Sequence, residues 1–224
     1  MAIAFTNESH DIANGAGGPL TMSEPTGTAQ GDVLVCVFMI TGANTFTPPS
    51  GWTTLYSGTS ATSNFKYNLS YIVRGASAPN LTWTYNGIPY HECHILGFSG
   101  CDTTTPIDAQ AQTASHQGVN TNPDPPSVTA VSATTMALGI GINWNGAGGS
   151  TWGTSGGYTI RTTNAAGVDV VIATKSLSAS GAEDPPAFTG VSTGGSADIW
   201  EASITLDAAS VVAGLQWLTG VNSP

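Results

Sequence analysis

The fold is decided by the stretch GDVLVCVFMI at residues 31–40, because a fainter copy of it, TMALGIGI, follows at residues 135–142. Other features repeat with it: Trp52 and Tyr158 are 106 residues apart, and so are Pro79 and Pro185. Two sets of strands in the same order are typical of two interlocked Greek keys. We therefore predict an all-β fold, a jelly-roll β-sandwich of about eight to ten antiparallel strands built from two similar halves.

The two repeated stretches differ in how they distribute apolar side chains. Residues 32–40 are nearly continuously apolar and rich in Val, which predicts a strand buried on both faces. Its outer face then needs a cover, either an arm of the chain or a neighbouring subunit. The copy alternates instead, with large apolar side chains on one face and small residues on the other: Ala137, Gly139 and Gly141. The small face fits close approach by another backbone. We expect the sandwich either to face solvent or to form the contact between subunits of a homo-oligomer through this face, with a trimer favoured.

The repeat boundaries divide the chain into three parts. Residues 1–31 are predicted to be an N-terminal arm with a first short strand near 20–22. Residues 32–207 form the sandwich, with half repeats at about 32–100 and 134–206, and residues 208–224 form a C-terminal tail. Apolar side chains outside a sandwich need a partner surface. Either the tail folds back on its own domain or arm and tail bind another chain, through Ile3, Phe5, Val211, Val212, Leu215, Trp217 and Leu218.

Composition excludes several classes of function. Lys and Arg total 4 against 14 Asp and Glu, for a formal net charge of −10, and four cations cannot supply the phosphate contacts of a nucleic-acid-binding protein. The same deficit disfavours an anionic membrane surface. No apolar run is long enough to span a bilayer, and the first residues lack the apolar segment of a signal peptide. Three cysteines, an odd number, argue against a disulfide framework.

The segment His91-Glu92-Cys93-His94 has the residue types of a metal or catalytic site. Its spacing differs from the His-Glu-x-x-His zinc motif, in which the two histidines lie one helical turn apart. On a strand, His91 and Cys93 face one way and Glu92 and His94 the other. The repeat aligns His94 with Trp200, a core position, so we expect a structural histidine. A zinc ion would need further ligands, and the only candidates are His10, His116, Cys36 and Cys101.

Other motifs also favour structural roles. Residues 153–157 (GTSGG) match the nucleophile elbow of hydrolases, but that motif requires a strand followed by a helix, and here a glycine-rich turn is expected. Carboxylates in the loops near 102–108 and 183–184 are candidates for a calcium site, although single acidic residues in turns usually bond local backbone. No carboxylate pair suggests a glycosidase. We expect no catalytic residues, cofactor or metal.

Aromatic residues near turns offer an alternative, a sugar-stacking surface. The candidates are Trp52, Tyr56, Trp152 and Tyr158. Packing in the core or at its rim is the expected use of these side chains, but an exposed row would favour a carbohydrate-binding module.

Several turn and core signatures together resemble a loose family, the jelly-roll domains of tailed-bacteriophage virion proteins. They are Gly31-Asp32 before the apolar strand, Pro49-Ser50-Gly51-Trp52, residues 71–79 (YIVRGASAP), residues 98–102 (FSGCD) and Pro106-Ile107-Asp108. The likeness spans about residues 31–207 and includes no catalytic residues. It implies a structural protein without enzymatic activity, most readily a capsid decoration (cement) protein on the outer capsid surface of the virion, with the major capsid protein as its partner. The alternative is a carbohydrate- or receptor-binding module of a phage tail or fibre.

Overall fold

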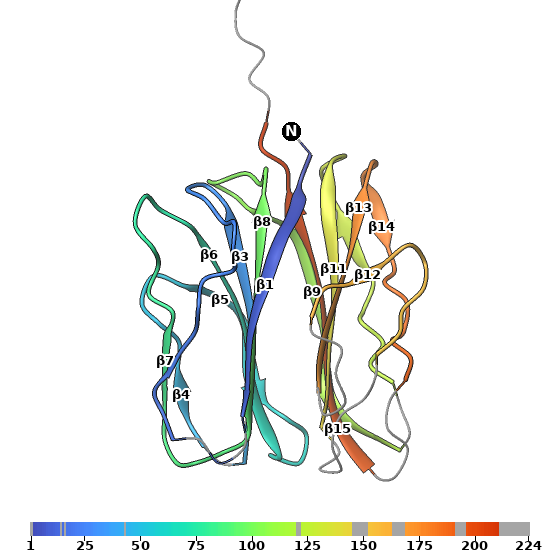
Figure 1. Ribbon diagram of the computed structural model, residues 1–224. Coiled ribbons are helices and arrows are strands. Elements are labelled where there is room, and N and C mark those ends of the chain that lie inside the picture. Colours follow the sequence, from blue (N-terminus) through green and yellow to red (C-terminus); the bar gives the residue numbers. More distant parts are fainter. Residues whose placement is uncertain are drawn as a thin grey trace, which may run out of the picture.

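The chain folds entirely into β-strands, turns and irregular segments wherever its structure is described. The computed structural model describes residues 2–13, 15, 17–42, 44–119, 122–144, 152–162, 169–190 and 196–210. Within these ranges there is no helix, and so none that could cross a membrane. The predicted all-β sandwich of antiparallel strands is confirmed (Figure 1).

Two five-stranded antiparallel sheets pack face to face and contain ten strands, within the predicted range. The first sheet has the order β1 (Ala4–Ala13), β8 (His91–Ser99), β3 (Val33–Thr41), β6 (Phe65–Val73), β5 (Thr53–Thr59). The second has the order β12 (Thr159–Ile160), β13 (Val170–Leu177), β11 (Thr135–Trp144), β15 (Ser196–Asp207), β9 (Ile107–Val119).

The internal repeat is confirmed in the strand order. Each half of the chain supplies all five strands of one sheet, and the second sheet counted from β9 has the same order as the first counted from β1. When their strands are matched by the repeat, the two sheets face each other in reverse order. β8 therefore lies opposite β13, and β6 lies opposite β15. A hydrogen bond from the Val170 amide to Glu92 marks the first contact, and stacked rings of Tyr67 and Trp200 mark the second.

The expected N-terminal arm is wrong in its first part. Ala4–Ala13 is a full edge strand, β1, which pairs with β8 from Ala4↔Ser99 to Ala13↔His91. The pairing explains how a polar segment enters the fold, because its backbone groups complete the sheet while its side chains alternate between the two faces. The short strand expected near residues 20–22 is confirmed as β2 (Leu20–Thr21).

The outer face of the first sheet is covered by the chain itself. β3 is buried on both faces, as predicted. The cover is a small sheet of β2, β7 (Thr82–Tyr85) and β4 (Phe46–Thr47), which packs Leu20, Trp83 and neighbouring side chains onto the outward residues of β3. This cover forms the outermost layer beside β3, β5 and β6 in Figure 1.

The small-residue face of β11 is closed in the same way, which corrects the expectation that it forms a contact between subunits. Prolines occupy the space above it: a Cβ placed on Gly139 would lie 3.0 Å from the Pro185 Cβ, and one on Gly141 only 2.5 Å from the Pro123 Cβ. The remaining strands of this layer are β10 (Val128–Ala130) and β14 (Gly181–Glu183), which pair with each other. Close backbone approach was predicted correctly, but the approaching segment belongs to the same chain.

The first and last described segments meet at one end of the sandwich (Figure 1). The Ala209 amide donates to the Gly100 carbonyl, and Ala208 forms a bridge with Cys101. A Cβ on Gly100 would lie 2.4 Å from the carbonyl oxygen of Ala2. The last described residues therefore lie close to the start of the chain.

Candidate functional site

The side chains of the His91–His94 segment divide between the two faces of β8, as the sequence predicts. Glu92 and His94 point into the space between the sheets and are completely buried. His91 and Cys93 point outward beneath the β2-β7-β4 cover, where the Cys93 Sγ lies 3.7 Å from that of Cys36. The segment therefore contributes Glu92 and His94 to the interior between the sheets, and His91 and Cys93 to the layer beneath the cover.

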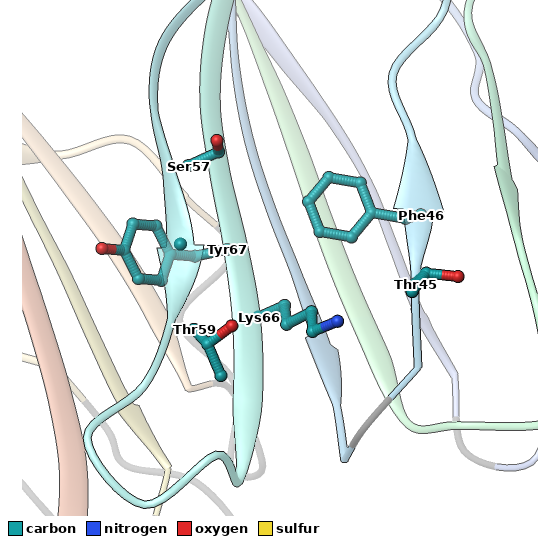
Figure 2. Close-up of a pocket in the computed structure, with 7 residues that line it drawn as sticks. Thr45, Phe46, Ser57, Thr59, Lys66 and Tyr67 are labelled. Atoms are coloured by element: carbon teal, nitrogen blue, oxygen red, sulfur yellow. The ribbon is translucent and has the colours of Figure 1, made fainter.

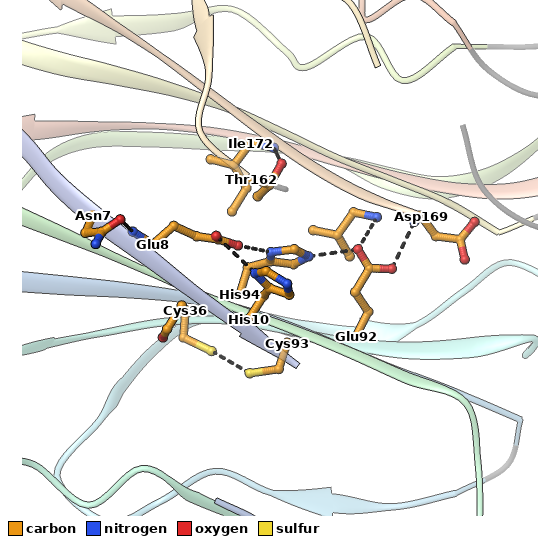
Figure 3. A network of polar contacts seen from close by, with 12 residues as sticks. Asn7, Glu8, His10, Cys36, Glu92, Cys93, His94, Thr162, Asp169 and Ile172 are labelled. Atoms are coloured by element: carbon orange, nitrogen blue, oxygen red, sulfur yellow. Dashed lines mark hydrogen bonds and ion pairs between the residues drawn. The ribbon is translucent and has the colours of Figure 1, made fainter. Parts of the chain in front are cut away.

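His94 is the centre of a network of polar contacts that joins β1, β8 and β13 (Figure 3). Its Nδ1 lies 2.7 Å from the Glu8 Oε1, and its Nε2 lies 2.8 Å from the Glu92 Oε1. Glu92 also accepts hydrogen bonds from the backbone amides of Asp169 (2.9 Å) and Val170 (3.0 Å) and from the Tyr90 hydroxyl (3.0 Å). Every strand of the network is held to another by at least one of these bonds.

The contacts of His94 determine its charge. Burial lowers the pKa of His94, but hydrogen bonds to Glu8 and Glu92 and their negative charges outweigh burial and raise this pKa to about 9. Burial raises the pKa of Glu8, but its contacts with His94 outweigh burial, so that the net pKa of Glu8 lies below the ordinary value. At neutral pH His94 is thus an imidazolium that lies between the carboxylates of Glu8 and Glu92. Both of its ring nitrogens donate hydrogen bonds.

Asp169 responds in the opposite way. Burial and the negative charge of Glu92 raise the pKa of Asp169 to about 8, although a hydrogen bond from Tyr90 opposes the shift. Its Oδ2 is buried and has no hydrogen-bond partner among the residues that the structure describes. Asp169 therefore keeps its proton at neutral pH, and the network holds one positive charge, two negative charges and one neutral acid.

This network is buried, and its polar groups bond mainly to one another. All its ring nitrogens and most of its carboxylate oxygens have partners within the fold, and His94 has no exposed surface. The expectation of a structural histidine is met by this geometry. His91 is similarly placed: its Nε2 lies 2.8 Å from the Asp11 Oδ1, and its Nδ1 lies 3.3 Å from the Tyr85 hydroxyl. The described residues contain no group of three or more His, Cys, Asp or Glu side chains arranged to hold a metal ion.

The GTSGG segment at residues 153–157 forms a glycine-rich turn, as predicted. The Tyr158 amide donates to the Ser155 carbonyl, and Gly156 and Gly157 have φ values of 63° and 81°, in the left-handed region that favours glycine. Gly153 forms a bridge with Thr189. No helix follows the turn, so Ser155 lacks the setting of a nucleophile elbow.

The loop carboxylates bond groups within the fold, and only Asp102 bonds the backbone of its own turn. Asp102 accepts from the amides of Thr104 and Thr105, and these bonds lower the pKa of Asp102. Asp108 accepts from the amides of Val131 and Ser132. In the second loop, Glu183 pairs with Lys175, and Asp184 accepts from the Ser127 hydroxyl.

The residues predicted to bind a partner fall into two groups. Ile3 is buried in the core between the sheets, and Phe5 packs against that core with its ring 5.8 Å from the ring of Phe98 and beneath the Arg161 guanidinium. Their assignment to an external partner is therefore wrong, since Ile3, just before β1, and Phe5, on β1, pack against the protein's own core. Val211, Val212, Leu215, Trp217 and Leu218 lie outside the described residues.

The predicted aromatic candidates for sugar stacking form no exposed row. Trp152 and Tyr158 are buried beneath the second sheet's cover, Trp52 packs 5.5 Å from Trp83, and Tyr56 packs 6.5 Å from Trp200. Packing in the core or at its rim, the use expected for them, is confirmed.

Phe46, an aromatic residue that the sequence did not single out, lines a surface pocket of about 250 Å³ (Figure 2). The pocket lies between β4 and the β5–β6 edge of the first sheet. It is lined by Thr45, Phe46, Ser57, Gly58, Thr59, Lys66 and Tyr67. The sequence feature that could have indicated this pocket is Lys66, one of only four cations in the chain.

Comparisons with known proteins identify no relative. No family model matches the chain, and neither a curated protein nor a solved structure is significantly similar to it.

Proposed function

We propose that this protein is a non-enzymatic structural protein of a bacteriophage virion, and specifically a capsid decoration (cement) protein that binds the outer head surface. Its partner is the major capsid protein, and its role is to strengthen contacts between capsid subunits by burying surface between them. The family resemblance of residues 31–207 motivates the class of protein. The chain's arrangement supports the mode of binding.

One observation carries the proposal: a self-contained sandwich is followed by an apolar sequence. The described core is built from residues 3–208, with both sheets covered by segments of the same chain. After the Ala209–Gly100 hydrogen bond, the sequence continues with Val211, Val212, Leu215, Trp217 and Leu218. Five large apolar side chains within eight residues favour burial against a partner.

The remainder of the surface is consistent with an external position. The net charge of −10 and the low content of charged residues, 8%, suit a polar domain whose solubility depends on Thr, Ser and Asn. Stable interfaces bury about 1,200–2,000 Å² in total. An apolar segment of this length, repeated on neighbouring subunits, supplies an anchor for an interface of that size.

The first test is the copy number of the protein in purified particles from its source, measured by quantitative mass spectrometry. Hundreds of copies per particle support head decoration, because the capsid lattice alone offers so many equivalent sites. A few dozen copies or fewer would contradict it and favour the tail or fibre alternative. Absence from particles would reject both virion roles.

The second test is a binding assay with particles that lack the protein. Truncation after Ser210 removes residues 211–224 and keeps the bonds of Ala208 and Ala209, so it should abolish binding while the far-UV circular dichroism spectrum stays that of a β protein. The matched variants are Val211→Ser/Leu215→Ser/Trp217→Ser, expected to lose binding, and Gln216→Ser/Thr219→Ser, expected to retain it. Full binding by the truncated chain would contradict the proposed anchor.

A further inference from the structure

The four cations of the chain are not equally engaged. Arg74 pairs with Glu24, and Lys175 pairs with Glu183. Arg161 donates to the Thr174 hydroxyl and lies 4.7 Å from the ring centroid of Phe5. Lys66 differs from these three, since within the described part of the chain it has no ion pair, hydrogen bond or ring contact. In a chain of net charge −10, an uncommitted ammonium group next to a pocket indicates a place for an anion.

The pocket beside Lys66 combines this charge with an aromatic wall and hydroxyl groups. Lys66 pairs with Thr59 across β6 and β5, so both side chains project from the outer face of the first sheet. Figure 2 shows the Phe46 ring extending from β4 toward β6 and the Lys66 side chain extending from β6 toward β4. Ser57 and Thr59 add hydroxyl groups on the β5 side, whereas the Thr45 hydroxyl points away from the pocket and donates to the Asn86 Oδ1.

An unsatisfied acceptor lies on the same face of the sheet. Asn68, two residues after Lys66, pairs with Ser57 across β6 and β5, and it is almost completely buried. Its Nδ2 donates to the Thr54 hydroxyl, but its Oδ1 has no partner within the described structure. A buried acceptor left without a donor is unfavourable, but Asn68 is not among the residues that line the pocket, so a ligand there is bound without it.

The size and chemistry of the pocket restrict the ligand. A volume of about 250 Å³ is below the roughly 300–1,000 Å³ of pockets that hold drug-sized ligands, so it suits a single sugar ring. An ammonium group selects a carboxylate through a charge-assisted hydrogen bond, an aromatic face packs against the apolar face of a pyranose ring, and the hydroxyls bind sugar hydroxyls. The net negative charge of the chain disfavours extended polyanions.

We propose that this pocket binds one hexuronic acid residue, with its carboxylate on the Lys66 Nζ and its ring against Phe46. Ser57 and Thr59 bind its hydroxyls. The site gives the protein an affinity for glycans that present a single uronic acid residue, a function separate from attachment through residues 211–218. The inference does not rest on the capsid role, because the pocket and the apolar C-terminal sequence are different parts of the chain.

The test is a titration of the ¹⁵N-labelled full chain, followed by NMR chemical shifts, with D-glucuronate and D-galacturonate as probes and D-glucose and acetate as comparison ligands. At least one uronate should shift the amides of residues 45–47, 57–59 and 66–68. Lys66→Gln should weaken that binding about tenfold, and Phe46→Ala should weaken it without removing the preference for uronate over glucose. Lys175→Gln, which removes a cation already paired with Glu183, is the matched control and should bind as the original chain does.

The contradicting outcomes are equally specific. Equal binding of acetate and uronate would mean an adventitious anion only, and equal binding of glucose and uronate would remove the role of Lys66. Shifts outside the pocket, or no shift at millimolar uronate, would also overturn the proposal. The amide spectrum of each variant reports whether it is folded, and the two variants change the pocket independently, so a folding defect in one leaves the other to decide.

Discussion

His94 and Trp200, which the 106-residue repeat aligns, are both fully buried between the sheets. His94 pairs with Val37 of β3, and Trp200 pairs with Ile142 of β11. On the Trp200 side the space between the sheets is filled by its stack on Tyr67, with ring centroids 4.2 Å apart. On the His94 side it is filled by an imidazolium and two carboxylates. The interior between the sheets is thus stabilised by aromatic packing beside Trp200 and by buried charge beside His94.

Replacing His94 should therefore destabilise the fold strongly. His94→Ala leaves Glu8 and Glu92 buried without their positive partner, and breaking a buried charged pair costs about 3–5 kcal/mol. Urea unfolding followed by tryptophan fluorescence measures this loss. The control is His116→Ala, because His116 is 41% exposed and lies 4.0 Å from Glu201, so that its removal should change the free energy of unfolding by less than about 1 kcal/mol. Similar losses in the two variants would contradict the role of the network.

The same network predicts that stability falls as pH rises from neutral. The pKa of His94 is about 9 in the folded state against 6.5 for an ordinary histidine. Its contribution is therefore fully present below pH 6.5 and is lost as pH rises through about 9, and it amounts to about 3 kcal/mol. Unfolding free energies from urea titrations at pH 6, 7, 8 and 9 measure this decline. A stability that stays constant or rises over that range would contradict it.

Asp169 adds a decline that begins at lower pH. The unfolded state releases this proton near pH 4, whereas the folded state keeps it up to a pKa of about 8, so the folded state binds more protons between these values and stability falls as pH rises. The variant Asp169→Asn removes this contribution and keeps that of His94. The difference in unfolding free energy between the original chain and the variant should thus change between pH 4 and 8 and be constant above pH 9.

The sequence predicts the strands that follow a regular pattern, but not the contacts between distant segments. The apolar run at 31–40 and the alternation at 135–142 were sufficient to identify β3 and β11. The sequence did not predict β1, because the polar residues of this stretch contact their partners only in the folded chain. Glu8, for example, contacts His94, which lies 86 residues later. The pocket was missed for the same reason, since Phe46 and Lys66 lie on strands of different sheets that the sequence does not relate.

The three thiols should be unreactive in the folded protein. All three cysteines are free and buried. Burial, the contact with Cys36 and nearby carboxylates raise the pKa of the Cys93 thiol, and burial with the charges of Asp32 and Asp207 raises that of Cys101 to about 12. Since the thiolate is the reactive form, DTNB at pH 8 should label no cysteine in buffer and three per chain in urea. Rapid labelling in buffer would show that a cover opens easily.

The proline layer over β11 should not tolerate a larger residue at Gly141. A Cβ there would lie 2.5 Å from the Pro123 Cβ and 3.3 Å from the Phe188 ring. Gly141→Ala therefore forces the cover outward, and overpacking of this kind costs about 1–3 kcal/mol. Gly75→Ala is the matched control, because Gly75 is exposed and its nearest neighbour would lie 4.0 Å away. Thermal unfolding of the two variants separates these cases, and an unchanged midpoint for Gly141→Ala would mean that the cover is loosely packed.

Removing residues 2–13 should unfold the protein, whereas removing residues 211–224 should not. The first deletion takes away β1, which leaves the β8 edge unpaired and removes Glu8 from His94. It also removes Ile3 and Phe5 from the core. The second deletion leaves every described strand intact. Circular dichroism and urea unfolding measure both variants: we expect a cooperative transition for the C-terminal truncation and none for the N-terminal one. A stable N-terminal deletion variant would mean that Ala4–Ala13 is a dispensable arm after all.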